Sequence, residues 1–291
     1  MTGIRGAKPR RRRAFFARLR GALIATYSDG CLATAKGAAY SALLAFFPLL
    51  TTTATLLIRV KADFVSRQIS GFLSEVLPPG TQDLVFYYFA VRGKHPLLVP
   101  VTGMLVTVWA ASGVIVSLME GFGAAYRITA ARSFIRQRIV ALLLVAGAAV
   151  PAAAASVLML FGARAERWLA RSLGLLPAGA EELRGWVFIL GIAARYALAI
   201  GAIAAGAAIL YRFGPDRAQR WSGVWPGAVL ATALWLATTW VFDWYVRHIA
   251  NYNVVYGSLA AVMMLLIWMY VLAVIAFIGC EFNAQSGRRA L

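Results

Sequence analysis

The chain has 291 residues, of which 61% are hydrophobic and only 14% are charged, and its mean hydropathy is +0.73. A soluble protein of this size carries about 25% charged residues, so the composition excludes an ordinary soluble domain and predicts an integral membrane protein. The formal net charge of +18 is a feature of some nucleic-acid-binding proteins. Here the basic residues flank apolar runs, a pattern that favours membrane topology and contact with anionic lipids, and nucleic acid is not expected as a partner.

The N-terminal segment is strongly basic. Residues 1–20 are predicted to form a basic arm, disordered over residues 1–13. Residues 14–27 place apolar side chains at near-helical spacing with Arg18 and Arg20 between them, which predicts an amphipathic helix. Two placements are open for this helix: the headgroup region beside anionic lipid, or the inner end of a helix bundle. Charges interrupt the segment, so no cleaved signal peptide is expected.

Six apolar segments follow, and each is long enough to cross a hydrocarbon core of about 30 Å as a helix. Because lipid offers no partners to open backbone groups, all six must be helical. The predicted fold class is therefore all-α: a polytopic membrane domain over residues 21–285 with a tail at residues 286–291. Amphipathic interfacial helices are also expected, one of them near residues 65–76 in the loop 59–96. The predicted spans are residues 37–58, 96–119, 139–163, 185–211, 221–246 and 256–280.

The distribution of Lys and Arg predicts the orientation. With the N-terminus inside, the inner segments hold 18 of the 29 Lys and Arg residues and the outer segments hold 10. This bias predicts that both termini are cytoplasmic. Cys31 and Cys280 would then lie near the reducing side of the membrane, as free thiols.

Arg195 is the sharpest candidate for a functional residue. It falls within the fourth span, where an arginine costs about 2.5–3.5 kcal/mol on insertion scales and should face protein or water. Ala199, Ala202 and Gly206 share its helix face and would let another helix approach closely. Arg195 could contact an anionic substrate group, with Asp243 as a second substrate-binding candidate. It could equally form a structural ion pair with Asp243, and both interpretations stay open.

Three further charged residues fall at the inner ends of predicted spans. Lys36, Glu120 and Glu281 could form a polar inner gate, or they could be ordinary residues of the membrane interface. The two histidines, His95 and His248, fall on separate outer loops. The chain shows no metal-ligand spacing, phosphate-binding glycine loop or nucleophile–base pair, so no enzyme activity, metal or cofactor is expected.

Several motifs resemble the YihY/BrkB family of bacterial inner-membrane proteins. The most specific are RWSGVWPGAVLATALW at residues 220–235, NYNVVYGSLAAVMMLLIWMY at residues 251–270 and GCEFNA at residues 279–284. VLPPG at residues 76–80 and YRFGP at residues 211–215 are also similar to the family pattern. The motif positions that we single out are Pro226, Gly227, Asn253, Tyr256, Gly257 and Asn283.

The resemblance implies six helices, both termini inside and a location in the bacterial inner membrane. The family has carried a ribonuclease label ("ribonuclease BN") and a virulence label. Our leading hypothesis is a transporter or translocator of an anionic amphipathic lipid or solute that contributes to envelope integrity. The alternative is a membrane scaffold for envelope assembly without transport, and a ribonuclease is the third hypothesis. Membrane lipids, mainly anionic ones, are the expected partners, and a homo-oligomer is a further possibility.

Overall fold

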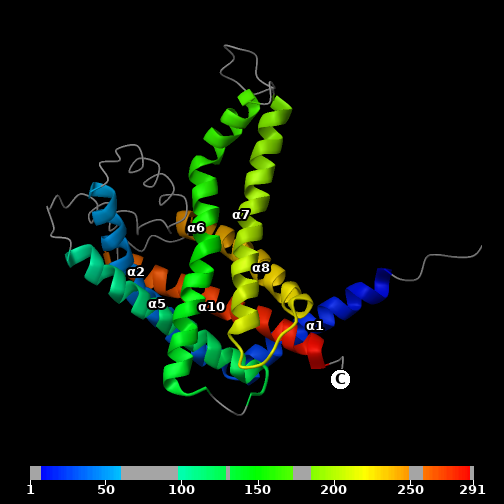
Figure 1. Ribbon diagram of the computed structural model, residues 1–291. Helices are drawn as coiled ribbons and strands as arrows, with labels where there is room; N and C mark the ends of the chain where they lie inside the picture. Colours follow the sequence, from blue (N-terminus) through cyan, green and yellow to red (C-terminus); the bar gives the residue numbers. More distant parts are fainter. Residues whose placement is uncertain (1–7, 60–97, 129–131, 173–184, 249–257, 289–291) are drawn as a thin grey trace, which may run out of the picture.

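The computed structural model describes residues 8–59, 98–128, 132–172, 185–248 and 258–288 (Figure 1). All regular elements in these ranges are helices, and six of them are long and apolar enough to span a membrane. The all-α, six-span prediction is therefore confirmed. The helix predicted near residues 65–76 lies outside the described residues. The elements are α1 (Lys8–Ser28), α2 (Cys31–Arg59), α5 (Leu98–Ala125), α6 (Phe134–Ser172), α7 (Gly185–Phe213), α8 (Trp221–His248) and α10 (Ser258–Arg288).

Two helix boundaries differ from the sequence prediction. The first helix, α1, begins at Lys8, so residues 8–13 are helical and do not belong to a disordered arm. Arginine is a good helix former, and four arginines in succession continue the helix toward the N-terminus. The last helix, α10, continues to Arg288 and does not end near Cys280, so Glu281 and Asn283 lie inside it.

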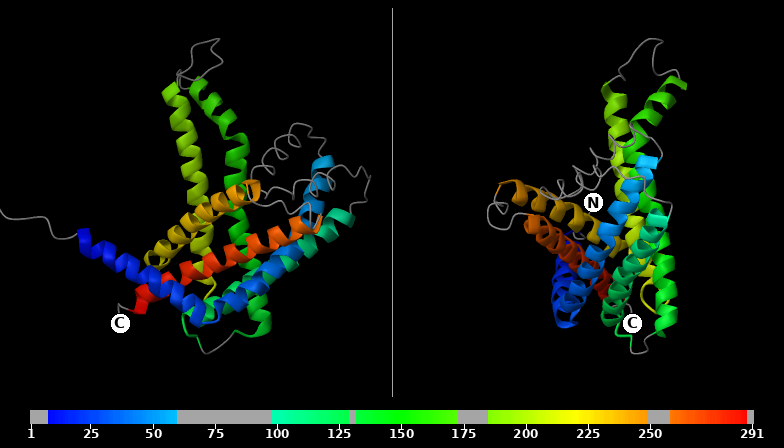
Figure 2. Two further views of the ribbon diagram at one scale, coloured as in Figure 1. Left: turned by 180° about the vertical axis from the view of Figure 1, so that it is seen from behind. Right: turned by 90° about the vertical axis from the view of Figure 1, so that its left-hand side faces the viewer.

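The spanning helices form three antiparallel pairs (Figures 1 and 2). The first pair is α2 with α5, the second is the tall hairpin of α6 with α7, and the third is α8 with α10. The junctions α1–α2, α5–α6 and α7–α8 gather at one end of the bundle together with the C-terminal end of α10. We call this the basal end, and the opposite end the distal end.

Small residues set the distance between α2 and α5. Gly37 lies against Ser117, Gly113 against Ser41, and Gly103 against Thr52. A side chain at any of these glycines would press on the hydroxyl residue opposite. Short side chains on both helices allow close backbone approach, which is how membrane helices pack without a hydrophobic driving force.

The basal part of α10 is the centre of the bundle. This helix packs against α1, α2, α5 and α8. Every residue from 277 to 284 is buried, so this stretch is enclosed on all sides of the helix. A helix covered on every face belongs to the interior of a protein, and α10 therefore fixes the positions of its neighbours.

Candidate functional site

An apolar cavity of about 380 Å³ lies among all six spanning helices. Nine of its 21 lining residues are alanine and one is Gly206 from α7, and the others have larger side chains. Because alanine side chains are short, the helices leave this space open between them. The lining residues are Ala38, Ala42, Val114, Ile115, Leu118, Phe122, Ala148, Ala152, Ala202, Ile203, Gly206, Ala207, Leu210, Tyr211, Ala231, Thr232, Trp235, Met269, Leu272, Ala273 and Ala276.

Three lining residues have polar side chains, and each of them already donates a hydrogen bond to a backbone carbonyl. The hydroxyl of Tyr211 donates to Ala276 O at 2.8 Å. The indole N–H of Trp235 donates to Leu272 O at 3.1 Å, and the hydroxyl of Thr232 donates to Ala228 O at 2.9 Å. The cavity wall is thus apolar in character and suits a hydrocarbon chain better than a hydrated group.

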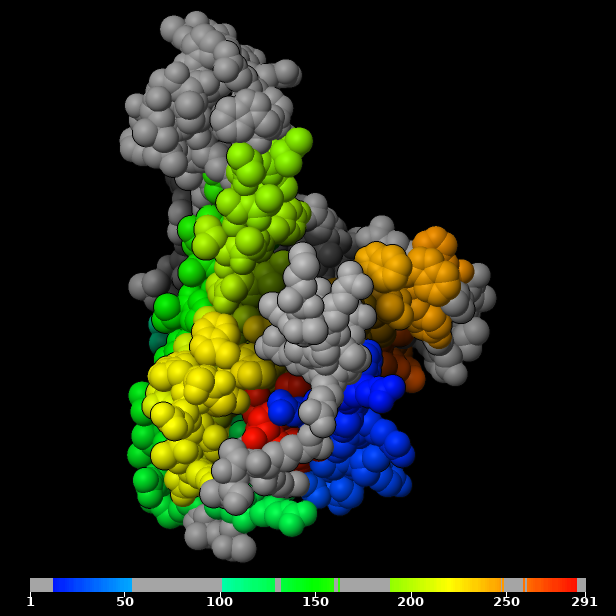
Figure 3. All heavy atoms as spheres, turned by 90° about the vertical axis from the view of Figure 1, so that its right-hand side faces the viewer, coloured from blue at the N-terminus to red at the C-terminus, as the bar shows by residue number. Residues whose placement is uncertain are grey.

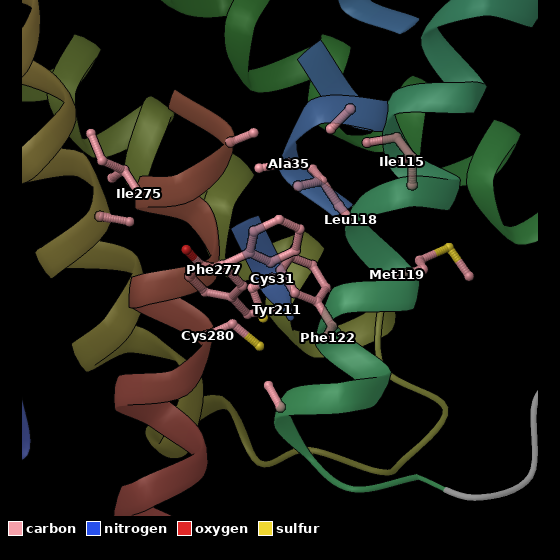
Figure 4. Close-up of a cluster of buried hydrophobic side chains, with 14 of the residues drawn as sticks. Cys31, Ala35, Ile115, Leu118, Met119, Phe122, Tyr211, Ile275, Phe277 and Cys280 are labelled. Carbon is pink, nitrogen blue, oxygen red and sulfur yellow. The ribbon is translucent and has the colours of Figure 1, made fainter. Parts of the chain in front are cut away.

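Three aromatic rings lie together near the basal end (Figure 4), and two of them, Phe122 and Tyr211, line the cavity. The ring of Phe122 lies 5.5 Å from that of Tyr211 and 5.9 Å from that of Phe277, edge to face in both cases. These rings come from α5, α7 and α10, so the contact ties three helices together. Glycine at position 121 makes room for it, because a Cβ there would collide with the ring of Phe277. We call these three rings the aromatic floor.

Asn283 links α10 to the first turns of α8. Its Oδ1 accepts a hydrogen bond from the backbone N–H of Gly227 at 2.7 Å, and its Nδ2 donates to Val224 O at 3.0 Å. The helices touch here because Gly227 and Gly279 have no side chains: a Cβ on Gly227 would collide with Gly279 O. The family-motif position Asn283 is therefore a contact between helices, with both ends of its amide in use.

Glu281 is fully buried beside this contact. Its carboxyl interacts electrostatically with Cys31, Cys280 and Tyr126. Lys36 and Glu120, by contrast, are exposed on α2 and α5. The three proposed gate residues thus occupy different environments, and a gate formed by them stays a prediction.

Tyr126 lies just past the end of α5, against the same buried cluster. Burial raises the pKa of its phenol well above the usual value, and the nearby Cys280 and Glu281 raise this pKa further. Arg217 acts in the opposite direction. The phenol is therefore neutral at physiological pH and functions as an uncharged packing group at the basal end.

Arg132 holds the turn between α7 and α8. Its guanidinium donates to the carbonyls of Gly214 and Pro215, both at 3.2 Å, and its Nε lies 3.0 Å from Asp216 Oδ1. The YRFGP motif ends in this turn: its Pro215 is buried, and its Gly214 packs against the ring of Phe122. A cation near the carbonyl end of α7 also complements the helix dipole.

Arg195 lies on α7, and its aliphatic stem covers Gly162 of α6, where no side chain intervenes. The small-residue face predicted to accompany it does point inward: Ala199 is buried, and Ala202 and Gly206 line the cavity. A second small-residue face of the same helix points outward, because Ala193, Ala197 and Gly201 are exposed. Asp243 is half-buried near the distal end of α8. The pairing of Asp243 with Arg195 and the substrate role of both residues stay predictions.

Sequence reasoning missed the cavity and the Arg132 contact. Among the motif residues, Pro226 is exposed in the second turn of α8, while Asn253, Tyr256 and Gly257 lie outside the described residues. The YRFGP motif was the available signal for the turn, since it contains both Tyr211 of the aromatic floor and the residues that Arg132 contacts. Within the described ranges, no three His, Cys, Asp or Glu side chains gather as they would around a metal ion.

Comparisons with known proteins place the chain among bacterial membrane proteins. It is 26% identical over 256 residues to the ribonuclease-like protein YfkH of Bacillus subtilis, covering 86% of this chain and 88% of that protein. It is 27% identical over 256 residues to a UPF0761 membrane protein of Tolumonas auensis, covering 86% and 78%. A shorter stretch of 57 residues, 20% of this chain and 13% of its relative, is 44% identical to a UPF0761 membrane protein of Alkalilimnicola ehrlichii.

No solved structure matches the chain. The family described as Virulence factor BrkB matches residues 11–290, which is nearly the whole chain. This match agrees with the helical membrane fold. The chain therefore belongs to the Virulence factor BrkB family of membrane proteins.

Proposed function

We propose that the protein translocates an anionic amphipathic lipid of the bacterial envelope and contributes in this way to envelope integrity. The observation that supports this proposal is the apolar cavity of about 380 Å³ at the centre of the six spanning helices. Ligand cavities in proteins typically measure about 300–1,000 Å³, so the space is large enough for part of a lipid chain. The polar side chains of its wall are already hydrogen-bonded to the backbone. An apolar chain therefore suits the cavity better than a polar group.

Arg195 supplies the site for the anionic group in this proposal. It shares a face of α7 with Ala202, which lines the cavity, and the two residues are separated by roughly 10 Å along a helix that rises about 1.5 Å per residue. A lipid with its headgroup beside Arg195 would therefore extend its chain toward the cavity. The position of Arg195 on the distal side of the cavity suits a lipid that enters from that side.

The proposal includes an orientation. We place the protein in the bacterial inner membrane with both termini in the cytoplasm, so that the basal end faces inward. The basal connections carry Arg127, Arg132, Arg217 and Arg220, in agreement with the excess of positive charge on cytoplasmic loops. The name of the relative from Tolumonas auensis, a membrane protein, supports the location in a membrane.

Lipid translocation in proteoliposomes tests the proposal. The vesicles contain headgroup-labelled phosphatidylglycerol in both leaflets, and a membrane-impermeant reductant reports how much inner-leaflet label becomes accessible. Ala202→Leu fills the cavity and should reduce the rate to that of protein-free vesicles. Ala197→Leu is the matched control, because it makes the same change on the exposed face of the same helix and should leave the rate unchanged.

A second pair of variants tests Arg195. Arg195→Met keeps an apolar stem over Gly162 but removes the charge, whereas Arg195→Lys keeps the charge. We expect a loss of about tenfold or more for Met and a smaller loss for Lys, because a charge-assisted contact contributes about 1.5–3 kcal/mol. Equal rates in wild-type and protein-free vesicles would contradict translocation of this lipid and favour the scaffold hypothesis.

A further inference from the structure

One face of α1 is fixed against the basal end of α10. Ala22 is completely buried there with Ile278 and Phe282, and the ring of Phe15 lies 5.5 Å from that of Phe282. The side chain of Gln285 covers Gly21 on the same face. One face of α1 therefore packs on the inner end of the bundle, which is one of the two placements that the sequence left open. It also fixes which side chains of α1 remain free to meet something else.

The opposite face of α1 presents large apolar side chains. Phe16 is 65% exposed, Ile24 57% and Tyr27 77%, and Leu23 is 49% exposed. Phe16, Leu23 and Tyr27 follow at i, i+7 and i+11, so they form an apolar stripe on one side of the helix, with Arg20 between Phe16 and Leu23. Such a stripe would be unfavourable in water, which indicates that it is covered in the native environment.

The charge of α1 indicates what covers this stripe. The helix contains seven basic residues and no acidic residue, and Arg13 and Arg20 are exposed beside the apolar stripe. Helices that combine a basic polar face with aromatic and aliphatic side chains bind at the boundary between lipid headgroups and acyl chains. Two copies of α1 would bring like charges together, so the charge disfavours a dimer through this face.

The position of α1 agrees with this environment. Only Asp29 and Gly30 separate α1 from the spanning helix α2, so the C-terminal end of α1 lies where the chain enters the membrane. Figures 1 and 3 show α1 on the outside of the bundle, beside the C-terminal end of α10. Because α1 packs on α10 along one face and continues into α2 at its C-terminal end, its apolar stripe is held at the bilayer surface.

We propose that α1 is an interfacial helix that binds the anionic phospholipid surface of the leaflet at the basal end. Phe16, Leu23, Ile24 and Tyr27 enter the boundary between headgroups and acyl chains, and the arginines contact phosphate. Each basic residue near an anionic surface strengthens binding by about fivefold. This inference does not depend on lipid translocation, because it concerns a different surface of the molecule.

Spin labels on full-length protein in vesicles test the proposal. Labels are placed at Leu23→Cys and Tyr27→Cys, with Leu143→Cys as a lipid-facing reference and Arg217→Cys as a reference on the exposed α7–α8 turn. The native thiols of Cys31 and Cys280 are buried. Wild-type protein treated with the same spin-label reagent verifies that neither of them is labelled. Collision with oxygen reports a lipid environment, and collision with a water-soluble nickel chelate reports an aqueous one.

In vesicles of equal parts phosphatidylcholine and phosphatidylglycerol, we expect the labels at positions 23 and 27 to resemble the one at Leu143→Cys more than the one at Arg217→Cys. Combined Arg13→Gln, Arg18→Gln and Arg20→Gln changes should shift these labels toward water, and high salt should do the same in the unmodified helix. Labels at positions 23 and 27 that match Arg217→Cys in these vesicles would overturn the proposal. If neither oxygen nor the nickel chelate reached these labels and their spectra showed spin–spin broadening, the apolar stripe would be covered by a second protein copy. That result would overturn the proposal as well.

Discussion

Two residues at the helix junctions adopt left-handed backbone conformations, and they differ in how well the side chain suits that conformation. Gly30, between α1 and α2, has φ +72°, which costs glycine nothing. Arg127, directly after α5, has φ 53° with a full side chain. The backbone N–H of Ile128 donates to Gly123 O at 2.9 Å across this turn, so the strained conformation closes the end of α5.

Arg127→Gly should therefore stabilise the protein. Relief of a left-handed conformation is worth about 1 kcal/mol at such a helix end, partly offset by the greater freedom of glycine in the unfolded chain. Thermal unfolding in detergent should show a higher midpoint for this variant. Arg127→Ala is the control, since it removes the charge and keeps the strain, and an equal rise for Ala would attribute the effect to charge.

Gly30→Ala should do the reverse. No atom lies within 4 Å of the position of its Cβ, so the substitution acts through the backbone alone. A cost of about 1 kcal/mol is expected from the left-handed conformation. The same unfolding measurement checks this value, and an unchanged midpoint would mean that the junction can adopt another conformation without loss.

At the scale of the elements, the contact between α8 and α10 combines a close approach of the two backbones with side-chain hydrogen bonds. Gly227 and Gly279 bring the two backbones together, and Asn283 then bridges them through both ends of its amide. The same region of α10 also receives the hydroxyl of Tyr211 from α7. Polar groups inside an apolar bundle have few alternative partners, so each of these bonds specifies one arrangement of the helices.

Asn283→Ala should weaken the bundle by about 1–3 kcal/mol, because Val224 O loses a buried donor and Gly227 N–H loses a buried acceptor. Asn283→Asp should be no better, since a carboxylate oxygen would face Val224 O. The control is Ser286→Ala, which removes only a bond to the preceding turn of the same helix and should be near neutral. Equal stability of Asn283→Ala and wild type, measured by denaturant unfolding in mixed micelles, would contradict this role.

At the scale of the whole molecule, the sequence predicts the spans well because their signal is local: length, apolar content and flanking charge are all read from contiguous residues. The cavity cannot be predicted in this way, since its wall is formed by residues of six helices that meet only in the fold. The same holds for Arg132 and Asp216, because the whole of α6 and α7 lies between them in the sequence. Glu281 illustrates the limit most clearly. It follows the uncharged segment directly, as an interface residue would, yet the surrounding helices bury it completely.

The two cysteines provide a measurement of global folding. Cys31 of α2 and Cys280 of α10 are both fully buried in the same cluster. A maleimide should therefore label neither of them in the folded protein and both of them over the temperature range in which the bundle unfolds. Rapid labelling of one thiol at low temperature would indicate that its helix opens separately, and intact-mass analysis distinguishes one label from two.

The aromatic floor also constrains how any occupant of the cavity could move. Phe122, Tyr211 and Phe277 come from three different helices, and the hydroxyl of Tyr211 is bonded to α10. Passage toward the basal end therefore requires α7 and α10 to part, with the loss of ring contacts and a hydrogen bond together. Two of these rings, Phe122 and Tyr211, form part of the cavity wall. Movement across the whole membrane would need a second conformation, and its barrier would be set largely by these three rings.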